Sequence, residues 1–365
     1  MEPLRRRRDH AVLIDRVPGE RGRFTGVYSS SVIGAMFDAQ RKRKPKGSLY
    51  ATFTDIDDSL TRHGEEGVAQ RIIDGERVLD RPIIAVTGNH FPWMRQRMER
   101  GEPFLRLPVL ATSVGTEVWV LQDDGTYQRD EEYRALLEGL GYDRKQLAAG
   151  AAAYIEQAAT AHPGWNVKFR HPDTDMNFLA GKDMSSDMEF EPTKITLRFS
   201  PSDPDFSLEA CIQELVASSE AIQGQLVVGC RVPSSHPLFD IDIVPTTKGG
   251  ALLYMTRRFE HMNGRPLHAV VAGDSGNDLD MLRTALRGDP AIEGRHIPAL
   301  LDGYKAETRG FAEELRSLGN GKVGTFVRHT DAFGQADRLA YVGVEEKTGP
   351  QALLRILQKL QRVQK

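Results

Sequence analysis

The sequence lacks the features that mark a secreted, membrane-spanning or zinc-binding protein. Its 365 residues include only two cysteines, which form no CxxC pair, so neither a disulfide framework nor a cysteine-based zinc site is indicated. No apolar run approaches the roughly 18 residues needed to span a bilayer. The apolar run after the basic N-terminus ends at Asp15, which is too early for the core of a signal peptide. We therefore expect a cytoplasmic protein with no membrane span.

The charge of the chain indicates no particular partner, apart from one basic segment. The formal net charge is −3, but residues 1–47 contain 12 Lys/Arg against 5 Asp/Glu. Such clusters bind nucleic acid or anionic lipid in some proteins, and in most they are solvated tails. We predict a basic N-terminal extension over residues 1–47 that is partly disordered, with a short helix at 31–37 that could pack on the body. This extension is the only hint of a nucleic-acid partner.

From residue 48 onwards the apolar pattern is that of an α/β protein. Short apolar runs typical of buried parallel strands occur at 48–54, 83–86 and 269–272. Amphipathic helices and alternating strands separate the second of these runs from the third. We predict an α/β fold with a Rossmann-like parallel-sheet core and an inserted α+β cap domain. The predicted parts are the first half of the core at 48–126, the cap at 127–238 and the second half of the core at 239–365.

The first candidate catalytic motif is a pair of carboxylates, Asp55 and Asp57, that ends the first predicted strand and is followed by the hydroxyl of Ser59. In an extended segment residues i and i+2 point the same way. Both carboxylates would therefore project into the crevice at the carboxyl end of the strand, where open α/β sheets bind ligands. One can attack phosphorus as a nucleophile, and the other can protonate the leaving oxygen and then activate water. Taken alone, the pattern also fits a solvated acidic turn.

Two further positions could hold a phosphate group. Thr87 and Gly88 follow the second predicted strand, where a hydroxyl and a backbone amide can donate to phosphate oxygens. Lys248 opens a predicted helix beside a glycine pair, which places a positive charge at a helix start. Each feature alone is common, the first as a strand-end turn and the second as a solvated lysine.

A fourth motif indicates a metal site. Asp274 and Asp278 lie in the sequence Gly-Asp-Ser-Gly-Asn-Asp, directly after the strand at 269–272. Oxygen ligands suit Mg²⁺, and these carboxylates would repel those of the first motif unless a cation lay between them. Mg²⁺ also neutralises charge on a phosphoryl group during its transfer. The four motifs together predict magnesium-dependent phosphoryl transfer.

The order of these motifs resembles the haloacid dehalogenase superfamily, and within it the sucrose-phosphate phosphatase branch, over residues 49–286 with a weaker tail to about 360. The resemblance implies that Asp55 is the nucleophile, which forms an aspartyl-phosphate, and that Asp57 is the acid and base. It implies that the Mg²⁺ ligands are Asp55, Asp274, Asp278 and the backbone carbonyl of Asp57. It implies phosphate contacts from Ser59, Thr87, Gly88, Lys248 and Asn277.

The residues that would recognise the sugar depart from that branch. Thr-Gly is followed there by Arg, and here by Asn89 and His90. Similar stretches elsewhere add Glu117 and Lys194 as candidate substrate contacts, and the polar loop 171–192 could face the site from the cap. The implied function is hydrolysis of a phosphorylated small molecule, a sucrose-phosphate-like or related glycosyl phosphate.

Two alternatives stay open at the level of sequence. A phosphosugar mutase on a related scaffold would keep water away from the aspartyl-phosphate and release little phosphate. A binding or regulatory protein could keep the scaffold without catalysis, although the complete set of motifs argues against it. The sequence gives no indication of the oligomeric state.

Overall fold

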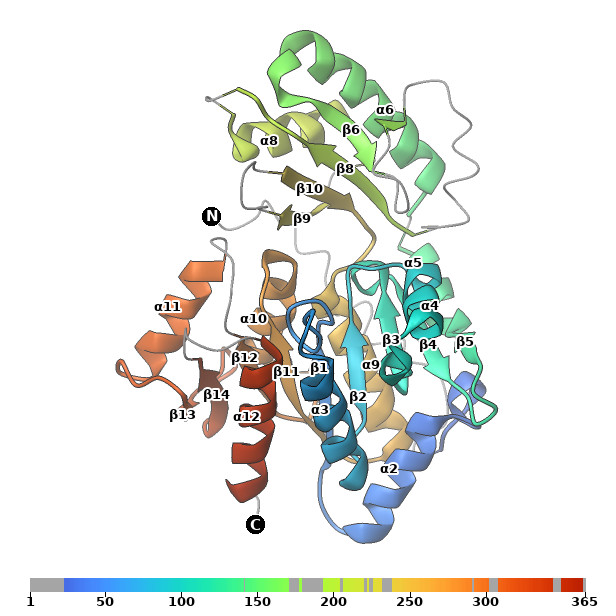
Figure 1. Cartoon of the computed structure of the whole chain (residues 1–365), viewed down its shortest axis with the longest axis vertical. Helices are drawn as coiled ribbons and strands as arrows, with labels where there is room; N and C mark the ends of the chain where they lie inside the picture. Colours follow the sequence, from blue (N-terminus) through green and yellow to red (C-terminus); the bar gives the residue numbers. More distant parts are fainter. Residues whose placement is uncertain are drawn as a thin grey trace.

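The structure, a computed structural model, contains two β-sheets of different kinds, one above the other in Figure 1. The larger sheet has nine strands in the order β13-β14-β12-β11-β1-β2-β3-β4-β5, and the smaller has five in the order β7-β6-β8-β10-β9. The predicted α/β fold is therefore confirmed. The residues that the structure describes are 23–140, 142–170, 177–178, 193–203, 206–219, 222, 226–231, 238–290, 292–301, 308–343 and 349–363.

The large sheet is parallel at its centre and antiparallel at both edges. β14, β12, β11, β1, β2 and β3 run parallel to one another, and β4, β5 and β13 are antiparallel to their neighbours. Its strands are β1 (Leu49–Thr54), β2 (Ile83–Val86), β3 (Val109–Thr112), β4 (Glu117–Leu121), β5 (Tyr127–Arg129), β11 (Leu267–Gly273), β12 (His296–Leu300), β13 (Thr325–His329) and β14 (Arg338–Val342).

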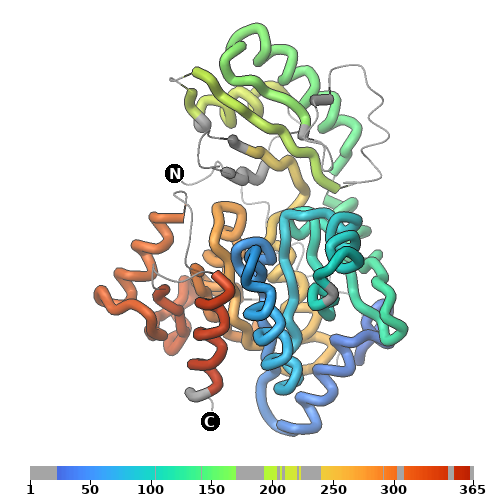
Figure 2. The backbone as a smooth tube through the Cα atoms, viewed as in Figure 1, coloured from blue at the N-terminus to red at the C-terminus, as the bar shows by residue number. Residues whose placement is uncertain are grey.

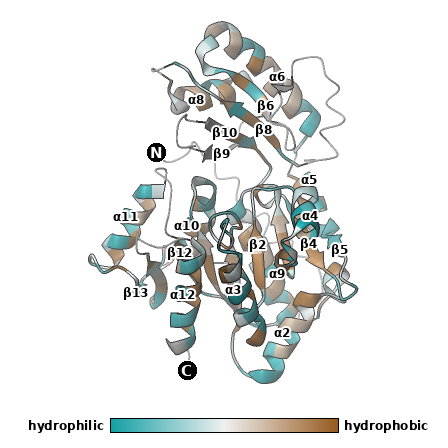
Figure 3. Ribbon diagram, in the orientation of Figure 1, coloured by the Kyte–Doolittle hydropathy of each residue, from teal (hydrophilic) through white to brown (hydrophobic). Residues whose placement is uncertain are grey.

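Helices cover both faces of this sheet, because its strands are apolar on both faces. In β2, Ile84 and Val86 face one cluster of core residues, and Ile83 and Ala85 face the other. Figure 3 shows the apolar strands between helices whose outer surfaces are hydrophilic. The first cluster packs against α2 (Val32–Arg43), α5 (Glu131–Glu138), α9 (Lys248–Asn263), α10 (Leu279–Arg287) and α11 (Arg309–Leu318). The second packs against α3 (Glu66–Val78), α4 (Phe91–Arg100) and α12 (Gly349–Val363).

The small sheet is antiparallel and carries two helices on one face. Its strands are β6 (Val167–Arg170), β7 (Asn177–Phe178), β8 (Ile195–Phe199), β9 (Leu226–Arg231) and β10 (Leu238–Ile243). The helices are α6 (Arg144–Ala161) and α8 (Leu208–Ser218), which share an apolar core with this sheet. Figure 2 shows that the middle of the chain forms this unit, whereas segments before and after it build the large sheet.

The boundaries between the two sheets differ from those predicted. β5 and α5 lie within the predicted cap, but β5 pairs with β4 and α5 contributes Tyr133 and Leu137 to the core of the large sheet. β10 lies mostly in the predicted second half of the core, but it pairs with β8 and β9. A local sequence pattern predicts that a segment is a strand, but not which strand it pairs with, because pairing depends on contacts distant in sequence.

Part of the predicted basic extension packs on the core. α2 begins after Ser31, whose hydroxyl accepts the backbone N–H of Gly34 at 3.2 Å, and its Ile33 and Phe37 are fully buried. Tyr28 donates to Asp130 at 2.7 Å across 102 positions of sequence. The helix predicted for 31–37 is thus present and extends to Arg43. The basic cluster at residues 5–8 lies outside the described residues.

Within the described part of the chain, none of the helices has both the length and the apolar character needed to cross a bilayer. Cys211 is a buried free thiol on α8, as its apolar surroundings in the sequence suggest. The side chain of Cys230 lies outside the described residues.

Candidate active site

The predicted motifs meet at one edge of the large sheet. Asp55 follows β1, Thr87 follows β2 and Asp274 follows β11, and these three strands are neighbours in the order β11-β1-β2. Because they run parallel, their carboxyl ends lie side by side. This is where open parallel sheets bind ligands, and the small sheet with its helices lies over the same edge (Figure 1).

The loop after β1 turns sharply and is fixed by its own backbone. The amides of Leu60 and Thr61 both donate to the carbonyl of Ile56, at 3.0 and 2.8 Å. Asp58 at the turn has a φ of 59°, a left-handed conformation that Asp tolerates better than most residues. The turn buries Ser59, whose hydroxyl donates to Asp274 Oδ1 at 2.9 Å. Ser59, predicted as a phosphate contact, therefore lies against a predicted metal ligand.

The loop after β11 is closed by Asp278. Its Oδ2 accepts the backbone N–H groups of Asp274 and Ser275 at 3.1 and 3.0 Å, and the Ser275 hydroxyl at 2.9 Å. These bonds leave Oδ1 directed at Lys248. Gly273 is needed here, because a Cβ at this position would lie 2.5 Å from the Cβ of Asp278.

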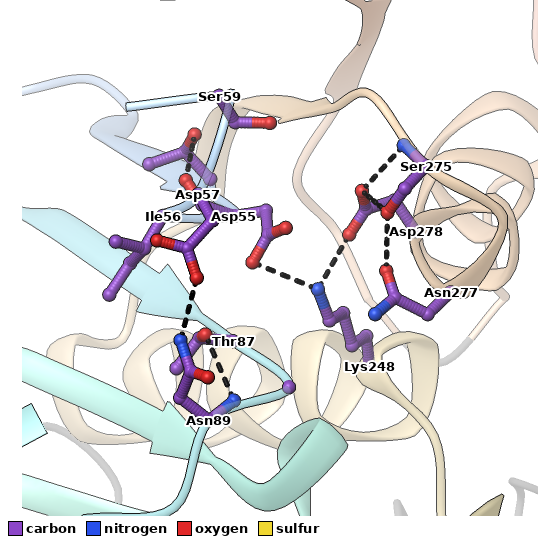
Figure 4. Close-up of polar contacts among 12 residues, drawn as sticks. Asp55, Ile56, Asp57, Ser59, Thr87, Asn89, Lys248, Ser275, Asn277 and Asp278 are labelled. Atoms are coloured by element: carbon purple, nitrogen blue, oxygen red, sulfur yellow. Dashed lines mark hydrogen bonds and ion pairs between the residues drawn. The ribbon is translucent and has the colours of Figure 1, made fainter. Parts of the chain in front are cut away.

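Lys248 joins the two acidic loops. Its Nζ lies 3.0 Å from Asp55 Oδ1 and 2.7 Å from Asp278 Oδ1 (Figure 4). The side chain is fully buried at the first position of α9. Thr247 caps this helix by accepting the Gly250 N–H at 3.2 Å, which fixes the direction of the lysine. Burial by itself lowers the pKa of Lys248, but Asp278 and Asp55 outweigh it and raise the pKa, so the ammonium stays charged.

Three buried carboxylates in this cluster could hold a metal ion. One oxygen from each of Asp55, Asp274 and Asp278 lies within 4.8 Å of the other two. Burial raises the pKa of Asp55 well above its usual range, Asp278 and Asp274 raise it further, and Lys248 opposes them. A bound cation would offset this repulsion, and an all-oxygen donor set matches the preference of Mg²⁺. The residues present therefore fit a magnesium ion.

Asp57 lies apart from this cluster. Its side chain is 52% exposed, and Figure 4 shows it pointing toward Asn89, whereas Asp55 points toward Lys248. Asn89 Nδ2 donates to Asp57 Oδ2 at 2.7 Å, and Arg97 donates to Oδ1 at 2.6 Å. The role predicted for its backbone carbonyl at the metal stays a prediction.

The predicted phosphate contacts after β2 lie beside the fourth motif. The Thr87 hydroxyl accepts the backbone N–H of Asn89 at 3.2 Å and still has its own proton to donate. A Cβ on Gly88 would come within 3.4 Å of Asn277 Nδ2, so these two predicted residues are neighbours. The Asn277 side-chain oxygen accepts the Ser275 hydroxyl at 2.7 Å, which leaves the amide group directed toward Gly88.

Of the four predicted substrate contacts, Asn89 donates to Asp57 as described. The side chains of the other three are buried and bonded to other residues of the protein. His90 caps α4 by accepting the Trp93 N–H at 3.3 Å. Glu117 starts β4 and accepts the Thr112 hydroxyl at 3.4 Å. Lys194, which immediately precedes β8, donates to the Gly88 carbonyl at 3.2 Å. The predicted substrate loop 171–192 lies outside the described residues, apart from β7.

Sequence reasoning missed Arg97, which contacts the candidate acid and base across 40 positions. The one available signal was its spacing on α4, two turns beyond the helix start that follows Asn89. An exposed amphipathic helix carries many such arginines, so that spacing could not distinguish it from a solvated one.

We expect Gly273→Ala to weaken Mg²⁺ binding by at least about tenfold, because the new methyl group would displace Asp278, and disturbing the shell around a metal typically costs 10–100-fold. Isothermal titration with Mg²⁺ measures this effect. Gly75→Ala on α3 is the matched control, because its Cβ would meet nothing within 4 Å. Equal Mg²⁺ affinity in both variants would show that Asp278 is not part of the metal site.

Comparisons with known proteins agree with the motifs. A family model described as sucrose-6F-phosphate phosphohydrolase matches residues 209–309. The sucrose-phosphatase from Synechocystis sp. PCC6803, solved in complex with sucrose and phosphate, is similar at TM-score 0.52 and 16% identity, over 87% of this chain and 99% of that chain. The haloacid dehalogenase-like hydrolase yhjK from Bacillus subtilis gives TM-score 0.44 and 13% identity, over 88% and 99%. No curated protein sequence matches the chain.

The sheet order, the inserted antiparallel unit and the likeness to the Synechocystis structure define a haloacid dehalogenase-type α/β fold with a cap. The family model, which covers Lys248 and the loop of Asp274 and Asp278, places the resemblance in the sucrose-phosphatase-like branch. The recognition made from the motifs is thereby confirmed. We refer to the unit built by the small sheet, α6 and α8 as the cap.

Proposed function

We propose that this chain is a Mg²⁺-dependent phosphatase that hydrolyses a sugar phosphate through an aspartyl-phosphate on Asp55. The observation that carries the proposal is the position of Lys248 Nζ, 3.0 Å from Asp55 Oδ1 and 2.7 Å from Asp278 Oδ1. An ammonium group next to a candidate nucleophile and a cluster of metal-binding carboxylates suits the transfer of a dianionic phosphoryl group.

In the proposed reaction, an oxygen of Asp55 attacks phosphorus, and the bond from phosphorus to the sugar oxygen breaks. Asp57 gives its proton to that leaving oxygen. Water then attacks the aspartyl-phosphate, Asp57 takes a proton from it, and inorganic phosphate and the Asp55 carboxylate are released. Lys248, with the hydroxyl of Thr87, stabilises the charge on the transferring oxygens.

Asp55, Asp274 and Asp278 would hold Mg²⁺ in this scheme. When bound, the ion neutralises charge on the carboxylates and on the phosphoryl oxygens. Ser59, which donates to Asp274 Oδ1, would orient that ligand. Sucrose and phosphate are the ligands of the Synechocystis structure, and that likeness is one reason to propose a sugar phosphate here.

The polar face of the cap also supports a sugar as the substrate. In β8, Ile195, Leu197 and Phe199 pack on the cap helices, so the alternate residues Thr196 and Arg198 lie on the other face. They pair across the sheet with carboxylates of β10: Thr196 donates to Asp242 at 2.5 Å and Arg198 to Asp240 at 2.8 Å. Figure 1 shows this sheet between its helices and the large sheet. All four side chains are buried and paired with one another here, so a sugar hydroxyl would bind by exchanging with these donors and acceptors.

We expect the protein to release phosphate from at least one member of a panel of mono- and disaccharide phosphates. Chelation of Mg²⁺ should lower the rate by at least about 100-fold, because the ion supplies several kcal/mol of charge stabilisation. Phosphate release is measured with Mg²⁺ and with EDTA, followed by Mg²⁺ restoration.

The result also separates the alternatives. If a sugar phosphate is converted to its isomer and little phosphate is released, the protein is a mutase and not a phosphatase. Tight binding of a sugar phosphate with neither conversion nor release would leave a binding protein. Phosphate release that is equally fast in EDTA would contradict the metal requirement.

A further inference from the structure

The carboxylate of Asp57 is held on both of its oxygens. Arg97 on α4 donates to Oδ1 at 2.6 Å, and the side-chain amide of Asn89 donates to Oδ2 at 2.7 Å. Asn89 immediately precedes the cap residue of the same helix, so one segment of the chain supplies both donors. Two donors on a side chain that is half exposed show that its orientation is specified by neighbours and not by burial.

Arg97 is itself fixed by a second carboxylate. Its Nε and one terminal nitrogen donate to the two oxygens of Glu102, at 2.9 and 2.8 Å. The arginine is only 15% exposed, and a forked pair of this kind is among the more rigid side-chain contacts. The guanidinium is therefore the stationary partner, and Asp57 is the one that can adapt.

The two donors differ in what they permit at Asp57. A guanidinium can only donate, so the oxygen that faces Arg97 must remain an acceptor. A side-chain amide can donate through Nδ2 or, after it turns over, accept through Oδ1. Oδ2 of Asp57 can thus carry a proton and donate it to Asn89, whereas a proton on Oδ1 would weaken the acceptor that Arg97 faces.

We propose that Arg97 is a positioning residue for proton transfer: it holds Asp57 Oδ1 as a permanent acceptor and leaves Oδ2, opposite Asn89, as the oxygen that gives and takes the proton. This inference rests on the proposed phosphatase function. It requires Asn89 to turn its amide over when Oδ2 is protonated, and to turn back when the proton has gone to the leaving oxygen. Without Arg97, only Asn89 would hold the Asp57 carboxylate, and either of its oxygens could take the place opposite Asn89.

The test compares two substrates that differ in their need for a proton. The sugar phosphate with the highest turnover in the panel has a poor leaving group that needs the proton, whereas p-nitrophenyl phosphate has a good one that does not. We expect Arg97→Gln to lower kcat/KM for the sugar phosphate by about 10–100-fold, part of what a proton donor contributes. The value for p-nitrophenyl phosphate should fall by less than about threefold, because kcat/KM covers only the steps up to the departure of the leaving group.

Two variants serve as matched controls. Arg95→Gln removes an exposed arginine of the same helix, which is paired with Glu99 at 3.8 Å, and should change neither value. Arg97→Lys keeps a donor and a positive charge, and should recover part of the loss on the sugar phosphate. An equal fall on both substrates in Arg97→Gln would overturn the positioning role and indicate a structural one.

A crystal structure of Arg97→Gln beside that of the wild type gives a readout that does not depend on activity. We expect the Asp57 side chain to leave its place against Asn89 or to become disordered; an unchanged orientation would overturn the inference. If the wild type hydrolyses neither substrate, the phosphatase proposal fails, and the orientation of Asp57 still decides the role of Arg97. If Arg97→Gln does not fold, Glu102→Gln, which frees the arginine, replaces it in both measurements.

Discussion

Asp55→Asn is expected to lose at least about 10⁴-fold of the phosphatase activity, since knocking out a catalytic nucleophile costs on the order of 10⁴–10⁶ in kcat. An amide of the same shape cannot form the aspartyl-phosphate. The protein should remain folded, because burial and then the neighbouring carboxylates raise the pKa of Asp55, so its charge is already disfavoured there. Phosphate release and a thermal melt, both at saturating Mg²⁺, measure the two effects.

Asp58→Asn is the control for this variant. It makes the same chemical change three residues along the same loop, at an exposed position whose φ of 59° Asn adopts as readily as Asp. It should keep nearly full activity. If Asp55→Asn retained activity well above the background of a preparation without enzyme, a nucleophile other than Asp55 would have to be sought.

The positions of the candidate site residues were predictable because they depend on strand ends. Asp55, Thr87 and Asp274 each follow a short apolar run, and parallel strands bring such ends together whatever lies between them. Lys248 was equally predictable, because it opens a helix beside a glycine pair, and the Thr247 cap fixes the direction of that helix start. These are local features of the sequence. A parallel sheet brings them together at the edge where its strands end.

The contacts around those positions were not predictable in the same way. Ser59 was predicted as a phosphate contact, which stays a prediction, and its bond to Asp274 through the turn at Asp58 was not foreseen. His90 was expected to face the substrate, and it caps α4. One of the two partners of Asp57 is Arg97, which lies on α4. Each of these contacts depends on the path of a turn or on the rotation of a helix about its axis. The spacing of residue types in the sequence specifies neither the path nor the rotation.

Lys248→Met should destabilise the metal-free protein by about 3–5 kcal/mol, the usual cost of removing one partner from a buried ion pair. The lysine is fully buried between Asp55 and Asp278, and its loss would leave three carboxylates with no positive charge between them. Without the competing ammonium, the carboxylates of the variant should bind Mg²⁺ more tightly than those of the wild type. Mg²⁺ should therefore restore more stability in the variant, because a ligand of the folded state adds stability that grows with the logarithm of its affinity. Urea unfolding in EDTA and in Mg²⁺ measures both quantities.

A double variant identifies the source of this instability. Lys248→Met combined with Asp278→Asn removes both members of the closer pair, at 2.7 Å, and should be more stable in EDTA than Lys248→Met alone, because residues in one buried network are not additive. Lys322→Met, at an exposed lysine, controls for the substitution itself. If Lys248→Met in EDTA unfolded at the same urea concentration as the wild type, the lysine would not be balancing ionised carboxylates. The ammonium of Lys248 would then not be held in place by ionised carboxylates before the substrate binds. The proposed activity depends on a site arranged in advance, so that basis for it would be lost.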